Sequence, residues 1–216
     1  MYEFLSGPAL WITFIIFLGG LIVRLTFLFG LSKGKDRILY NHIDMGWGLK
    51  SILHWLIPLG SVSLRSQPVF SIMVFVFHFC LLALPLFLGA HNLLWDESFG
   101  VSLWSMPDIW ADVMTIVFIC SGVFLLLRRL MRPEVRVLTD AWDYTLLILT
   151  VLPFLTGFIA YRQLGDYETF LILHILSAEI LLILIPFTKL GHMALFFFTR
   201  AFIGFEMGTR RGTRTW

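Results

Sequence analysis

The sequence predicts an all-α integral membrane protein, built as one bundle of five transmembrane helices. Of its 216 residues, 58% are hydrophobic and only 14% are charged. Soluble domains are about 45–50% apolar and about 25% charged, so this composition excludes a water-soluble globule. The apolar residues fall in five long runs that show no residue-by-residue alternation, which excludes the strands of a membrane β-barrel.

Each of the five runs approaches the roughly 20 apolar residues that a helix needs to cross a bilayer. The expected spans are Ala9 to Gly30, Pro68 to Ala90, Ile109 to Leu127, Tyr144 to Tyr161 and Thr169 to Thr188. The last run is open to continuation through Leu195 to Phe198. The sequence shows neither an internal repeat nor a low-complexity tract, so residues 1–216 are treated as a single membrane domain.

Basic residues are distributed unevenly between the predicted connections. The segment from Leu31 to Gln67, the third-to-fourth connection and the tail hold nearly all of them, whereas the other side holds only Arg162. By the positive-inside rule, the N-terminus is expected in the periplasm and the C-terminus in the cytoplasm. An odd number of spans also requires the termini to lie on opposite sides, so the two arguments agree.

A short amphipathic segment lies between the first two spans, at residues 45–57, and ends at Pro58. It is too short to cross a bilayer and is predicted to form a helix on the cytoplasmic membrane surface. Two roles stay open for it: a docking shelf for a soluble partner, or simple packing against the bundle.

Four of the six histidines fall within or at the ends of two spans. His78 and His91 belong to the second span, and His174 and His192 to the fifth. Ionisable groups at membrane depth are costly and usually functional. Because the two helices are antiparallel, His78 is expected opposite His192 and His91 opposite His174. Facing imidazoles are what a six-coordinate haem iron requires, so the pattern predicts two haems. The alternative is that the histidines only bond neighbouring helices.

The spacing of these histidines tests the pairing. His174 and His192 are 18 residues apart, which is five turns of a helix, so on one continuous helix both would face the same way. His78 and His91 are 13 residues apart and would diverge on an ideal helix, unless Pro85 between them kinks the span.

Other polar groups have open roles. His42 and His54, on the basic cytoplasmic segment, could replace His78 or His192 as ligands, serve a partner, or be ordinary interfacial histidines. Arg24 is predicted to neutralise a propionate of the inner haem, its alternative being to reach the cytoplasmic interface along its aliphatic stem. Glu179 could relay a proton or be a neutral structural carboxyl.

The stretch from Phe77-His78 to Gly89-Ala90-His91 resembles the second helix of the gamma subunit of respiratory nitrate reductases. The separation of His174 and His192, the span count and Arg24 late in the first span agree with that family. The spacing of His78 and His91 is longer than in the nitrate reductase subunit. The runs from Leu53 to Ser61 and from Ala83 to Leu88 look more like the cytochrome b subunits of transmembrane redox complexes in sulfate-reducing bacteria.

This resemblance implies a multi-pass subunit of the bacterial cytoplasmic (inner) membrane that carries electrons through two b haems in anaerobic respiration. The implied partners are a periplasmic multihaem cytochrome c and a cytoplasmic iron–sulfur subunit of the heterodisulfide-reductase type, besides membrane lipid; no nucleic acid is expected. The chain has no C-x-x-C-H and no C-x-x-C run, so the haems would be held by coordination and any cluster would belong to a partner. No catalytic residue is predicted, and catalysis would belong to the assembly.

The route of electron entry stays open. The connection from Asn92 to Asp108 is acidic and has no Lys or Arg, which favours docking of a basic cytochrome c. The nitrate reductase relatives instead oxidise a quinol, which leaves menaquinone as a second candidate ligand. Two further alternatives are a proton-conducting transporter subunit and a structural membrane anchor, both without haem. Against the transporter, no repeated halves with broken helices are visible.

Overall fold

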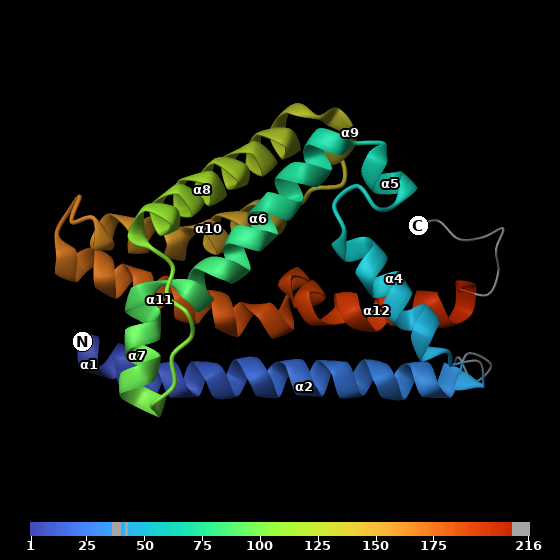
Figure 1. The fold of residues 1–216 in the computed structure, drawn as a ribbon, viewed down its shortest axis with the longest axis horizontal. Coiled ribbons are helices and arrows are strands. Elements are labelled where there is room, and N and C mark those ends of the chain that lie inside the picture. The colour runs from blue at the N-terminus through green and yellow to red at the C-terminus, as the bar shows by residue number, and fades with distance from the viewer. Residues whose placement is uncertain (36–39, 42, 209–216) are drawn as a thin grey trace. The chain divides into compact units, whose positions relative to one another are not determined.

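In the computed structural model, residues 1–35, 40–41 and 43–208 are described, and within them the chain is helical with no strand. Five helical segments are long and apolar enough to cross a membrane: Tyr2–Lys35, Pro68–Phe87, Asp108–Met131, Ala141–Tyr161 and Tyr167–Phe187. The all-α class and the five spans are therefore confirmed (Figure 1). The chain is a multi-pass membrane protein.

The second span ends earlier than the sequence predicted, and the fifth ends within one residue of the predicted Thr188, without the continuation left open. Helix α6, Pro68–Phe87, stops before Ala90 because Leu88 has extended backbone angles, and a separate helix α7, Gly89–Phe99, follows. Helix α11, Tyr167–Phe187, stops where Thr188 is extended, so it does not continue to Phe198. In each span a proline, which lacks an N–H and crowds the preceding turn, lies within two residues of the end.

The chain divides into two compact units, of which one comprises residues 72–178. It contains most of α6, all of α7, α8 (Asp108–Met131), α9 (Pro133–Arg136) and α10 (Ala141–Tyr161), and the first half of α11. Its core is aromatic: the rings of Phe77 and Phe118 are stacked with centroids 4.6 Å apart, and Phe154 lies 4.2 Å from Phe118. These contacts join α6, α8 and α10 (Figure 1).

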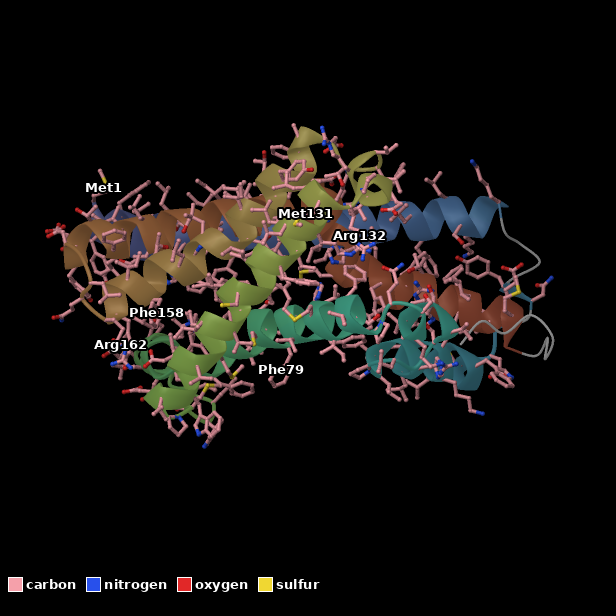
Figure 2. All side chains as sticks on the ribbon, turned by 90° about the horizontal axis from the view of Figure 1, so that it is seen from above. Met1, Phe79, Met131, Arg132, Phe158 and Arg162 are labelled. Carbon is pink, nitrogen blue, oxygen red and sulfur yellow. The ribbon has the colours of Figure 1, made fainter. Side chains whose placement is uncertain are left out.

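Small residues let α8 and α10 approach each other. Ser121 and Gly122 are buried on α8, and Thr150 is buried on α10. A Cβ placed on Gly122 would lie 2.8 Å from the side chain of Val151. Small residues are typical of helix interfaces in membranes, where apolar side chains gain little by leaving lipid. Accordingly, large apolar side chains such as Phe79, which is 67% exposed, point outward (Figure 2).

The other unit comprises residues 1–71 and 179–216. It begins with α1 (Tyr2–Phe4), a π-helical turn (Leu5–Ala9) and α2 (Leu10–Lys35), and continues with α4 (Met45–Leu56) and α5 (Val62–Arg65). After the end of α11, a 3₁₀ turn (Lys189–Gly191) leads into α12 (His192–Met207). Helix α4 packs along α12 in this unit (Figure 1).

Helix α4 lies within one residue of the predicted segment 45–57, and its two faces differ. Met45, Leu49 and Leu53 are exposed, which suits contact with lipid at a membrane surface. Gly48 and Ser51 on the opposite side are buried. The buried face of α4 packs against α12, which is not one of the five spans. Both roles left open by the sequence stay open.

Candidate functional site

The structure brings His91 and His174 together within residues 72–178. His91 lies near the start of α7, and His174 lies in the first half of α11. Their ring centroids are 6.0 Å apart, and the ring planes differ by 19°. These two residues are the outer pair that the sequence analysis placed opposite each other.

Both rings are held in the same way through Nδ1. Nδ1 of His91 lies 3.0 Å from the carbonyl oxygen of Pro85, and Nδ1 of His174 lies 2.7 Å from that of Pro153. Because a carbonyl only accepts hydrogen bonds, Nδ1 must carry the proton in each ring. Nε2 is then the nitrogen that keeps its lone pair. Histidines that bind metals are typically oriented by such a bond from the other ring nitrogen.

The proline and glycine residues around the pair explain this geometry. Pro85 is close to the C-terminus of α6, where carbonyls have no partner within the helix, so its oxygen can accept from His91. A Cβ on Gly157 of α10 would lie 2.8 Å from Nδ1 of His174. Only glycine therefore lets the His174 ring approach α10 as closely as it does. The sequence analysis missed Pro153 and Gly157, although a proline and a glycine four residues apart in an apolar span were a visible signal.

The rings are stacked, and only the distance between their centres is compared with the metal that the sequence predicts. Two imidazole nitrogens bonded to one metal at about 2 Å each place the ring centres about 6 Å apart. In the described part of the chain, no group of three or more His, Cys, Asp or Glu residues is arranged to hold a metal ion. Two neutral imidazoles suit an iron that already has four ligands from a porphyrin. Burial lowers the pKa of His91, which keeps its ring neutral, as a ligand must be.

The two inner histidines have the same Nδ1 arrangement on separate elements. Nδ1 of His78 lies 2.8 Å from the carbonyl of Val74 on α6, and Nδ1 of His192 lies 2.8 Å from that of Lys189. His78 belongs to the unit of residues 72–178 and His192 to the other unit. Their pairing at one haem stays a prediction.

His174 and His192 do not lie on one continuous helix, because α11 ends at Phe187 and His192 is the first residue of α12. The prediction that their 18-residue spacing makes them face the same way was therefore wrong. The five-turn register therefore does not relate His174 to His192. Likewise, His91 lies on α7 and not on the second span, so the divergence expected on one ideal helix does not apply.

Arg24 contacts the end of α11. Its Nη1 donates hydrogen bonds to the carbonyl oxygens of Pro186, at 2.8 Å, and Thr188, at 2.7 Å. Carbonyls at a helix C-terminus lack partners in the helix, and a cation there is favourable. Arg24 thus stabilises the break between α11 and α12. A guanidinium has five N–H donors, so these two bonds leave other donors for a haem propionate. The bond of Arg24 to a propionate stays a prediction.

The remaining candidates differ in their surroundings. His54 lies on α4, and its Nε2 is buried without a hydrogen-bond partner in the described structure. His42 lies outside the described residues. Glu179 is only 5% exposed, and its Oε1 also lacks a partner there. It follows His174 by five residues on α11, which places the two side chains on different faces of that helix.

The acidic side of the unit of residues 72–178 has one internal ion pair. Nε of Arg162, at the end of α10, donates to Oδ1 of Asp112 on α8 at 3.1 Å, and the two side chains form a salt bridge (Figure 2). Asp112 thus neutralises the one basic residue expected on this side. The other carboxylates of this side are Asp96, Glu97, Asp108, Asp166 and Glu168.

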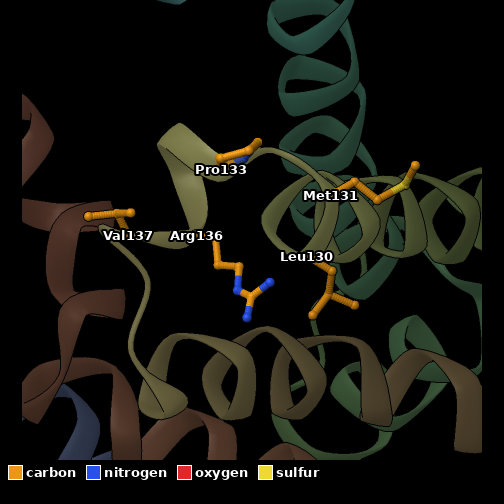
Figure 3. Close-up of a pocket in the computed structure, with 5 residues that line it drawn as sticks. All are labelled: Leu130, Met131, Pro133, Arg136 and Val137. Atoms are coloured by element: carbon orange, nitrogen blue, oxygen red, sulfur yellow. The ribbon is translucent and has the colours of Figure 1, made fainter.

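A hollow of about 380 Å³ lies at the connection between α8 and α9. It is lined by Leu130, Met131, Pro133, Arg136 and Val137 (Figure 3). None of the candidate histidines lines it. Its open shape and the lack of converging polar groups other than Arg136 give it no evident part in the histidine site.

Comparison with known proteins gives one informative alignment. A protein of Nitratidesulfovibrio vulgaris (strain Hildenborough), whose name is simply "Protein", is 42% identical over 219 aligned positions. The alignment covers 100% of this chain and 97% of the relative. No family model and no solved structure matches.

Proposed function

The chain belongs to the same family as this Nitratidesulfovibrio vulgaris protein. From its histidines, we propose that it works as the membrane cytochrome b subunit of a respiratory electron-transfer complex. In this proposal it carries electrons across the bacterial cytoplasmic membrane between a periplasmic multihaem cytochrome c and a cytoplasmic iron–sulfur subunit. The relative's name states no activity, so the proposal depends on the residues of this chain.

The observation that carries the proposal is the pair His91 and His174. Its ring separation of 6.0 Å suits two axial ligands of one iron, and both Nδ1 atoms are bound to carbonyls. Through Nδ1, each ring also links two helices, as the alternative expects: His91 of α7 binds α6, and His174 of α11 binds α10. These bonds use one nitrogen of each ring, so Nε2 stays available for a ligand.

The residues of the chain would hold and orient the cofactors. His91 and His174 would supply the axial nitrogens at one site, and His78 and His192 at the other. Two bound b haems would supply one-electron transfer in two short steps, where a single step across about 30 Å of hydrocarbon would be too slow. Pro85, Pro153 and Gly157 fix the position of the first histidine pair, because they accept its Nδ1 protons or give it room.

The acidic side supports a basic electron donor over a quinol. Arg162 is paired with Asp112, so it offers no compensation to Asp96, Glu97 and Asp108. Such a surface attracts a lysine-rich cytochrome c and mainly raises the rate of association. A neutral quinol gains nothing from these charges. Menaquinol oxidation is therefore the alternative that the kinetic test below distinguishes from reduction by a cytochrome c.

An optical spectrum tests the proposal directly. The purified full-length chain should show reduced-minus-oxidised haem b bands, with two haems per chain by pyridine haemochrome assay. Protein without colour would exclude the cytochrome assignment and favour the transporter or the structural anchor. Substituting His91 or His174 by alanine should leave one haem. If both haems persisted in His174→Ala, the ligand pair would be wrong.

The inner ligands are tested separately. His192→Ala should remove the second haem, whereas His54→Ala should retain both. Loss of a haem in His54→Ala with retention in His192→Ala would assign the buried Nε2 of His54 as the ligand instead.

The route of electron entry is tested by kinetics. Reduction by a basic cytochrome c should slow as salt shortens the Debye length from about 10 Å at 0.1 M. Fast, salt-independent reduction by a menaquinol analogue, blocked by a quinone-site inhibitor, would make the chain a quinol-oxidising subunit.

A further inference from the structure

The seam between α4 and α12 contains buried polar atoms without partners. The two helices meet closely, since a Cβ on Gly204 would lie 2.8 Å from the Cα of Gly48. In the described residues, several polar groups on or beside these two helices have a buried nitrogen or oxygen with no hydrogen-bond partner: Tyr40 Oη, Ser51 Oγ, His54 Nε2, Trp55 Nε1 and Arg200 Nε. The site argued below uses the three of them that belong to Ser51, Trp55 and Arg200. A buried polar atom left without a partner costs about 1–3 kcal/mol, so such atoms call for an explanation.

Arg200 is the most unusual member of the set. Its guanidinium carbon lies 3.7 Å from the centre of the Trp55 ring, a cation–π contact. No carboxylate of the described residues forms a salt bridge with it. Burial lowers the pKa of Arg200, yet arginine keeps its proton in proteins. A partly buried cation therefore lacks a counter-charge, which is unfavourable unless a ligand supplies one.

The three groups share one chemical character. Ser51 and Trp55 are four residues apart on α4, so they lie on one face of the helix, and Ser51 is fully buried there. The indole and guanidinium nitrogens can only donate hydrogen bonds, and a hydroxyl can donate one. Their complement is a group that accepts hydrogen bonds and is negatively charged.

We propose that Arg200, Trp55 and Ser51 form a binding site for an oxyanion, a carboxylate or a phosphate, in the α4–α12 seam. If the proposed function holds, the oxyanion is a propionate of a haem, and this choice of ligand rests on that function. The other source of the same chemistry is the phosphate of an anionic phospholipid. The α4 helix then has a role that its amphipathic pattern did not predict: it closes a polar site against α12.

The test compares three variants of the full-length protein in mild detergent. Arg200→Gln removes the charge, and Trp55→Phe removes the indole N–H while keeping a ring. Lys50→Gln is the matched control, because Lys50 is an exposed cation on the same helix. The readouts are the midpoint potential of each haem by spectroelectrochemical titration, the haem content, and the phospholipid retained in native mass spectrometry.

For a propionate, Arg200→Gln should lower the midpoint potential of one haem and leave the other unchanged. A cation near the haem favours the reduced state, so its loss favours the oxidised one. Trp55→Phe should shift the same haem less in the same direction, and Lys50→Gln should shift neither. Trp55→Phe keeps an aromatic ring at this position and leaves Arg200 in place, so it decides the question if Arg200→Gln fails to fold.

The lipid arm separates the two sources. Loss of a bound anionic phospholipid in Arg200→Gln and Trp55→Phe, but not in Lys50→Gln, would support the oxyanion site with a lipid as ligand. That result in a protein without haem would support this site while the proposed function failed. Unchanged potentials together with equal lipid retention in all three variants would overturn the proposal.

Discussion

Two places in this mostly apolar chain hold polar side chains: the histidine pair of α7 and α11, and the seam of α4 and α12. They differ in whether the protein supplies hydrogen-bond partners for the polar atoms. In the pair, the carbonyls of Pro85 and Pro153 bind one nitrogen of each ring. In the seam, Trp55 and Arg200 have buried nitrogens without a partner in the described structure. The pair is oriented by the protein alone, whereas in our proposal a ligand completes the seam. Polar satisfaction therefore distinguishes a preorganised site from one that depends on its occupant.

The largest expected effect comes from filling the closest contact of the seam. Gly204→Ala would place a methyl group against the backbone of Trp47 and Gly48, which cannot yield as a side-chain tip would. Overpacking of this kind costs about 1–3 kcal/mol. We expect a lower thermal midpoint in detergent and, under the proposed function, a shifted potential of the same haem that Arg200→Gln affects.

Gly19→Ala is the control for this change, because a Cβ there would meet no atom within 4 Å. It should leave the thermal midpoint unchanged or raise it, since alanine is favoured over glycine in a helix by about 1 kcal/mol. Equal thermal midpoints for Gly204→Ala and Gly19→Ala would show that α4 and α12 are not in close contact.

The second change tests the pair in the same way. In Gly157→Ala the new methyl group would lie 2.8 Å from Nδ1 of His174, so the ring must move and its bond to Pro153 must lengthen. We expect an altered low-spin haem signal in electron paramagnetic resonance, or loss of that haem, with the second haem unaffected. A Gly89→Ala variant is the control, because a Cβ at Gly89 would contact nothing within 4 Å. An unchanged signal in Gly157→Ala would mean that the His174 ring does not lie against α10.

The comparison also shows how far the sequence could predict the structure. The five spans and the short helix at residues 45–57 follow from apolar runs and amphipathicity, so they could be predicted. The helix end after Pro85 could not, because prolines kink some membrane helices and end others, depending on their neighbours. For the fifth span, the predicted end at Thr188 was right within one residue, but its possible continuation was left open. His91 and His192 were therefore assigned to spans that end before them.

The site residues divide along the same line. His91 and His174 could be identified because ionisable residues in apolar runs are rare. Ser51, Trp55 and Arg200 could not, since each has a common explanation at an interface, and only tertiary packing reveals that their polar atoms are buried. A residue's burial depends on which helices meet, and a single sequence does not contain that information.

A more local effect, limited to the connection between α7 and α8, is expected at Asn92, beside His91. This side chain is only 2% exposed; its Oδ1 accepts from the backbone N–H of Leu103 at 3.1 Å, and its Nδ2 donates to Ser105 Oγ at 3.2 Å. Asn92→Ala should cost about 1–3 kcal/mol locally by leaving partners unsatisfied. Faster hydrogen exchange at residues 100–107 checks it, with the exposed Leu93→Ala as control. Exchange equal to that of the control would show that Asn92 does not hold this connection.

The smallest effect is expected at Asp166, which caps the start of α11, the helix that carries His174. Its Oδ2 accepts a hydrogen bond from the backbone N–H of Thr169 at 2.9 Å. Side-chain and backbone hydrogen bonds from Thr169 lower the pKa of Asp166 in the folded protein. The stabilisation is therefore fully present above the ordinary pKa of the carboxyl and is lost as the pH falls through the lower folded-state value.

Asp166→Ala should thus lower the thermal midpoint at pH 7 by on the order of 1–3 °C, and the difference from the unmodified protein should vanish in acid. Glu168→Gln, which removes a charge from the same turn of α11, controls for electrostatics alone. Its effect should be smaller, because it removes attraction to the helix dipole but no cap. Equal decreases of the thermal midpoint in both variants would mean that the lost charge causes the effect and that the capping bond contributes nothing. A loss confined to Asp166→Ala would show that α11 is anchored at its first turn, just ahead of the histidine it presents.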